Sequence, residues 1–159
     1  YLYCSRTGER YPAGHIHNLS RDGWPLLVHY DLAQLRAGWN RDWISTGPRS
    51  MWRYAPVLPV SDPANIVSLG EGWTPLIRTT RLGAKLGCSD LWVKDEGINP
   101  TGSFKARGLS CALSMCKELG IRKIAIPSAG NAASASAAYA AAAGIECHIF
   151  MPRDVPQSN

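Results

Sequence analysis

The sequence lacks long apolar runs, paired cysteines and a signal peptide. Its longest apolar candidate, residues 132–143, is alanine-rich and too short to cross a membrane. No basic stretch with an apolar core opens the chain, and no initiator Met is present. The five cysteines form no CxxC pair, which favours reduced, mostly buried thiols. These shortages predict a cytoplasmic protein that has no membrane partner.

Blocks of basic residues are also lacking, although the net charge is +5. The arginines are scattered along the chain without an aromatic-basic motif, so we expect no nucleic-acid partner. A mild positive balance suits phosphorylated small molecules at least as well. Hydrophobic residues make up 45% of the 159 residues, enough for a packed core in about one domain of ordinary size.

A tight loop over residues 99–105 precedes the most regular part of the chain. Its Asn-Pro and Thr-Gly-Ser steps favour a turn, and an apolar run with helical spacing follows. The pattern predicts a helix from Ser103 to Leu119 that ends at Gly120, with Thr101 or Ser103 supplying the capping oxygen.

Lys105 is therefore predicted at or near the N-terminus of a helix. A positive charge there opposes the helix dipole, which suits a lysine that acts as a nucleophilic amine. Considered alone, a lysine at this position would be taken for an ordinary exposed lysine.

Three motifs follow one another in a familiar order. They are LGEGWTPL at residues 69–76, NPTGSFKARG at residues 99–108 and SAGN at residues 128–131. This set resembles the fold-type-II pyridoxal-phosphate enzymes, the group that contains threonine synthase, threonine deaminase and the cysteine-synthesising enzymes. The first motif is most similar to the threonine synthases.

The resemblance implies a role for each matched residue. Lys105 would bond to pyridoxal 5′-phosphate and then act as general base and acid, with Phe104 and Asn131 as further cofactor contacts. The substrate-binding candidates are Ser128, Gly130, Asn131, Ala132 and Thr74. Taken alone, the SAGN turn would be interpreted as a plain link between strand and helix, but the preceding NPTGSFK motif favours a binding role. Family loops often have SSGNTA, so Ala129 and Ala132 are departures that remove two hydroxyls.

Glu71 and Thr74 belong to the LGEGWTPL loop. Both are candidates for the wall of an active site. For Glu71, a structural pairing with an arginine is the alternative interpretation.

The expected fold class is α/β, with a parallel sheet and flanking helices as in the β subunit of tryptophan synthase. Continuous apolar strands are predicted over residues 91–94, 124–127 and 147–151, and a second helix over residues 131–143 that ends at Gly144. The expected division is an N-terminal region, 1–90, and the start of the cofactor-binding region, 91–159. Residues 153–159 are expected to begin the next helix.

The first sixty residues are less regular. Residues 1–30 are turn-rich and resemble a degenerate zinc ribbon, in which Thr7 occupies the second cysteine position. Cys4, His15 and His17 are too few for a structural site, so we expect no metal. One helix is predicted over residues 32–43, with an apolar stripe that packs in the core, and an extended connection over residues 47–63.

The resemblance implies threonine synthesis, in which O-phospho-L-homoserine and water give L-threonine and phosphate. A threonine or serine deaminase, a diaminopropionate-type ammonia-lyase and a non-catalytic remnant are the alternatives. The family's glycine-rich phosphate loop and ring-nitrogen residue have no counterpart in the 159 residues, which predicts a truncated chain that is inactive alone. The complete enzyme would take a small amino-acid substrate and could form a homo-oligomer.

Overall fold

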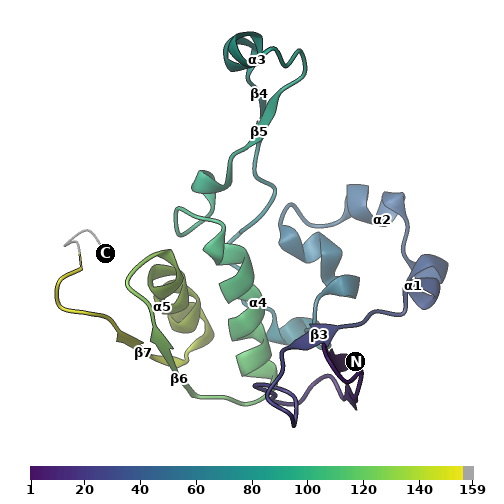
Figure 1. Cartoon of the computed structure of the whole chain (residues 1–159), viewed down its shortest axis with the longest axis vertical. Coiled ribbons are helices and arrows are strands. Elements are labelled where there is room, and N and C mark those ends of the chain that lie inside the picture. Colours follow the sequence, from purple (N-terminus) through teal and green to yellow (C-terminus); the bar gives the residue numbers. More distant parts are fainter. Residues whose placement is uncertain (156–159) are drawn as a thin grey trace.

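The first thirty residues form a small antiparallel sheet in the computed structural model, which describes residues 1–155 (Figure 1). Strand β1 (Leu2–Cys4) lies between β2 (Arg10–Tyr11) and β3 (Leu26–Val28). The Thr7 amide donates a hydrogen bond to Cys4 Sγ at 3.4 Å. Within residues 1–155, no three side chains of the metal-binding types gather in one place.

The helix predicted over residues 32–43 is in fact two helices, α1 (Leu32–Gly38) and α2 (Arg41–Thr46). The side chain of Asn40 divides them, because it accepts hydrogen bonds from the amides that begin α2. The predicted core stripe is also wrong: Leu32 and Trp43 are 64% and 60% exposed.

The connection predicted as extended contains two short 3₁₀ helices, η1 (Met51–Val57) and η2 (Pro63–Asn65). Ser50 caps the first and Asp62 the second, so local capping overrides the proline-rich composition. Met51, Trp52 and Arg53 are buried in this connection, whereas Tyr54 is exposed.

Strand β4 (Leu76–Arg78), helix α3 (Thr80–Leu86) and strand β5 (Trp92–Lys94) extend away from the rest of the chain (Figure 1). The strand predicted at 91–94 is confirmed as β5, but it pairs antiparallel with β4 and stays outside the parallel sheet. A short 3₁₀ helix, η3 (Glu96–Ile98), then leads to the 99–105 loop. The division of the chain near residue 90 stays a prediction.

The C-terminal part follows the predicted alternation closely. Helix α4 (Lys105–Glu118) precedes strand β6 (Lys123–Pro127), and helix α5 (Asn131–Ala143) precedes strand β7 (Glu146–Phe150). β6 and β7 are parallel, as predicted, and form a sheet of two strands. Left-handed Gly120 and Gly144 follow the two helices, with φ values of +70° and +67°. Of the helix expected at 153–159, residues 156–159 lie outside the described part, and 153–155 are not helical.

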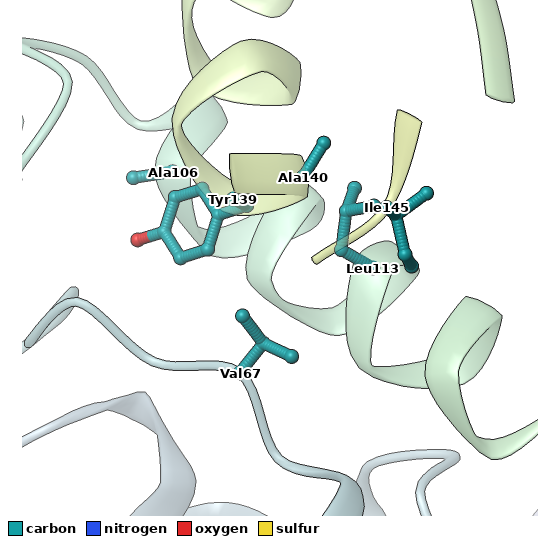
Figure 2. Packing of buried hydrophobic residues seen from close by; sticks show 6 residues of the cluster. All are labelled: Val67, Ala106, Leu113, Tyr139, Ala140 and Ile145. Carbon is teal, nitrogen blue, oxygen red and sulfur yellow. The ribbon is translucent and has the colours of Figure 1, made fainter. Parts of the chain in front are cut away.

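The core lies between α4 and α5 (Figure 2). Val67, from the loop between η2 and β4, and Ile145, between α5 and β7, join it. Alanines at the contact let the two helices approach closely. The cluster consists of Val67, Ala106, Leu113, Tyr139, Ala140 and Ile145.

The thiols differ from the prediction of mostly buried side chains. Cys4 is buried, Cys88 is exposed, and the other three cysteines lie between these extremes. Within residues 1–155, every helix is too short or too polar to span a bilayer.

Candidate functional site

Lys105 is the first residue of α4, where the sequence places it. The predicted cap is wrong, because the N-cap residue is Phe104 and no side chain caps the helix. Ser103 Oγ accepts from the backbone amide of Lys105 at 3.3 Å. Its side chain is half-buried, with Nζ 4.4 Å from the ring centroid of Phe104, which is 56% exposed. Thr101 Oγ1 is buried and has no hydrogen-bond partner in the described part of the chain.

The SAGN turn lies at the carboxyl end of β6 and leads into α5. The Ser128 amide donates to the Phe150 carbonyl at 3.0 Å, which anchors the turn to β7. Ser128 Oγ accepts from the amide of Gly130 at 3.4 Å, and Gly130 is the N-cap of α5.

The first two amides of α5, those of Asn131 and Ala132, have no acceptor among residues 1–155. Asn131 is exposed and Ala132 half-buried, so the start of this helix is open. Free amides at the N-terminus of a helix bind anions such as carboxylates.

Glu71 is completely buried and accepts four hydrogen bonds. Their donors are Trp52 Nε1 at 2.9 Å, Ser110 Oγ at 2.6 Å, Tyr139 Oη at 2.5 Å and the Leu69 amide at 2.9 Å. All four donors are neutral, so neither predicted role, cavity wall or arginine partner, describes this carboxylate. It joins η1, the LGEGWTPL loop, α4 and α5 at one point.

Burial raises the pKa of Glu71, but hydrogen bonds from Ser110 and Tyr139 outweigh it and hold that pKa below its ordinary value. Burial, and then the hydrogen bond to Glu71, raise the pKa of Tyr139. The pair is therefore a carboxylate and a neutral phenol.

Thr74 is 5% exposed, and its hydroxyl donates to Glu96 Oε1 at 2.6 Å. Glu96 also receives two bonds from Arg107 of α4, from Nε at 2.6 Å and from Nη2 at 2.7 Å, and one from Asn99 Nδ2 at 3.0 Å. This guanidinium holds the pKa of Glu96 at about 2. Thr74 thus belongs to a polar cluster that ties the 99–105 loop to α4.

The sequence analysis missed this cluster, although its signal was present. Asp95 and Glu96 precede the NPTGSFKARG string, and Arg107 lies within it. A carboxylate and an arginine inside one short motif favour a pair that fixes the loop.

The predicted site residues fall into three places. Phe104 and Lys105 begin α4, residues 128–132 begin α5, and Thr74 contacts α4 through Arg107. The two helices pack against each other (Figure 1). Within residues 1–155, no hydrogen bond joins Lys105 to Ser128, Gly130 or Asn131.

The groups at these helix starts fit pyridoxal phosphate. They offer an accessible primary amine at Lys105, an exposed amide side chain at Asn131 and the unsatisfied hydroxyl of Thr101. An aldehyde ligand needs the amine, and its ring oxygen needs a donor such as the amide.

A family of known proteins matches the part of the chain that contains these site residues. Residues 67–159 match the family model described as "Pyridoxal-phosphate dependent enzyme". Threonine synthase of Methanocaldococcus jannaschii is 37% identical over 149 residues, which are 94% of this chain and 37% of that protein. Threonine synthase of Methanosarcina acetivorans is 37% identical over 96% of this chain and 37% of its own length.

A third relative, threonine synthase of Synechocystis, is 44% identical over 100 residues, which are 62% of this chain and 26% of that protein. The chain thus spans about a third of the length of the curated relatives that it matches. The family match covers more than half of the chain and includes Lys105 and the SAGN turn. This chain belongs to the family of pyridoxal-phosphate dependent enzymes.

Proposed function

We propose that the complete protein containing this chain is a threonine synthase, which converts O-phospho-L-homoserine and water into L-threonine and phosphate. The observation that carries the proposal is the position of Lys105 at the start of α4, beside a helix whose first amides are free. Similarity to threonine synthases along 94% of the chain supports this choice within the family.

Lys105 would hold the cofactor and move protons between substrate carbons, as base and then as acid. Pyridoxal phosphate, when bound, supplies an electron sink for that proton transfer. Asn131 would hold the ring oxygen of the cofactor, and Phe104 would contact the cofactor beside Lys105. This amine needs no neighbouring base in the described residues, because it is itself the basic group.

The substrate's α-carboxylate would bind at the SAGN turn. The free amides of Asn131 and Ala132 point outward from the helix start and carry partial positive charge. Ser128 and Gly130 would fix the shape of the turn. Thr74 would hold the 99–105 loop in place through its hydrogen bond to Glu96. Binding of a small, free amino acid in the cytoplasm and assembly into a homo-oligomer belong to the same proposal.

Kinetics on the complete protein test the reaction. Phosphate release from O-phospho-L-homoserine should be faster than ammonia release from threonine, serine or diaminopropionate. Lys105→Ala should abolish the reaction, whereas Lys117→Ala, which alters an exposed lysine of the same helix, should leave it within about twofold. Faster ammonia release would replace the proposal with the lyase alternative, and no turnover of either substrate would favour a non-catalytic remnant.

A further inference from the structure

A cavity of about 310 Å³ lies beside the first turn of α4, where Arg107 lines it. Three cationic side chains line it, together with an indole and two hydroxyl-bearing residues. They are Arg53, Lys94, Arg107, Trp73, Ser50 and Tyr54. The volume is at the lower end of the range for pockets that hold small molecules.

The positive charge in this cavity exceeds the negative charge that faces it. Arg107 is neutralised by Glu96. Among the described residues 1–155, Lys94 Nζ donates to the Thr74 carbonyl alone. Within residues 1–155, neither Lys94 nor Arg53 has a salt-bridge partner.

Arg53 is the most informative of the three cations because it is only 8% exposed. Its Nη2 donates to the Gly47 carbonyl at 3.3 Å, while its Nε is buried with no partner in the described chain. Burying a charge that lacks a counter-ion is unfavourable, so a buried guanidinium is normally paired.

The loop beneath Arg53 has an unusual backbone. Trp73 has a φ of +52°, and its ring lies 4.0 Å from the Arg53 guanidinium. Gly72 has a φ of +94°, and a Cβ there would lie 2.5 Å from the Met51 amide nitrogen. A bulky residue in the left-handed region persists only where its surroundings enforce it, which is common in ligand clamps.

We propose that this cavity is a binding site for a phosphate-type oxyanion, with Arg53 and Lys94 as its main ligands. The planar fork of a guanidinium pairs with two oxygens of a phosphate, and an ammonium adds a point charge. Arg107 follows Lys105 by two residues, and this is about 200° around the helix axis. The site therefore lies on another side of α4 from the proposed catalytic lysine and does not rest on the proposed function.

The test is calorimetric titration of the complete protein, loaded with its cofactor, with inorganic phosphate at constant ionic strength. We expect a saturable site whose affinity falls at least tenfold in Arg53→Gln and in Lys94→Gln. Arg53→Lys should retain part of the binding, because a positive charge remains. Arg81→Gln removes an exposed arginine outside the cavity and should change nothing.

Using both Arg53→Gln and Lys94→Gln guards against a loss of binding that is caused by misfolding. Lys94 is exposed, so its substitution disturbs the interior less than substitution of the buried Arg53. Circular dichroism confirms that each variant is folded. Glycerol phosphate in a second titration distinguishes the source: tighter binding than phosphate indicates a phosphorylated metabolite, and equal or weaker binding indicates free phosphate. Absence of phosphate binding, or binding that neither substitution weakens, would overturn the proposal.

Discussion

Two carboxylates hold α4 in place, and they do so in opposite ways. Glu71 is fully buried and accepts hydrogen bonds from neutral groups on four segments. Glu96 has a side chain that is 26% exposed and pairs with Arg107. Glu71 belongs to the LGEGWTPL motif, whereas Glu96 lies three residues before the NPTGSFKARG motif, and only Glu96 has a cationic partner.

The difference shows how a buried charge can be stabilised without a counter-ion. Four donors together offset the cost of removing the Glu71 carboxylate from water, so its pKa stays below the ordinary value. At Glu96 the Arg107 guanidinium has the main role, and hydrogen bonds from Thr74 and Asn99 add to it. The stability of the buried Glu71 carboxylate therefore depends on each of its four donors. The stability of the Glu96–Arg107 pair depends mainly on its opposite charges.

Glu71→Ala should cause the largest loss of stability. Tyr139 Oη and the Leu69 amide would lose their acceptor, whereas Trp52 and Ser110 have a second one. Each buried donor left without an acceptor costs about 1–3 kcal/mol, so the free energy of unfolding should fall by roughly 2–6 kcal/mol. Urea unfolding of the complete protein, followed by tryptophan fluorescence, measures the change.

Glu9→Ala is the control for that prediction, because Glu9 lies near the surface, where it pairs with Arg21 at 3.6 Å and accepts from Tyr11 Oη at 2.7 Å. It should cost no more than about 1 kcal/mol. Equal losses for the two variants would show that the buried centre contributes nothing beyond a surface pair.

Gly72→Ala tests the backbone of the LGEGWTPL loop, directly after Glu71. The new Cβ would lie 2.5 Å from the Met51 amide nitrogen, which itself donates to the Glu71 carbonyl at 2.8 Å. Gly70→Ala is the matched control, since Gly70 has nearly the same φ, +93°, but open space around it. We expect the first variant to lose about 1–3 kcal/mol more than the second in thermal or urea unfolding. Equal losses would mean that only the backbone angle matters.

Glu96→Gln should have the smallest effect at neutral pH, about 1 kcal/mol, because the pair is partly exposed. Its signature is the pH dependence. The pKa of Glu96 falls from its ordinary 4.5 to about 2 on folding, so the carboxylate stabilises the fold above pH 4.5 and loses that contribution as the pH falls towards 2.

The difference in stability between the parent protein and Glu96→Gln should therefore shrink across that acid range. Glu9→Gln, at the exposed pair, provides the comparison. A constant difference from pH 7 to pH 2.5 would contradict the account of the Glu96–Arg107 pair.

The helices and strands of the C-terminal part could be predicted from sequence, because the signals that define them are short-range. Gly120 and Gly144 mark helix ends, and short apolar runs mark β6 and β7, so each signal lies within a few residues of its element. The site motifs are likewise contiguous, and the structure places Lys105 at the predicted helix start.

What could not be predicted depends on distant contacts. The pairing of β4 with β5 and the meeting of Trp52, Ser110 and Tyr139 at Glu71 join residues far apart in sequence. Apolar spacing alone also cannot tell whether a face is covered, and the exposed Trp43 shows this limit.

The most direct test of the account concerns Lys105 itself. The complete protein, loaded with pyridoxal phosphate, would be treated with borohydride, digested and mapped by mass spectrometry. We predict that the cofactor is fixed to the peptide containing Lys105, in stoichiometric amount. Label on Lys94 or Lys117 instead, with Lys105 unmodified, would contradict the assignment of the catalytic lysine.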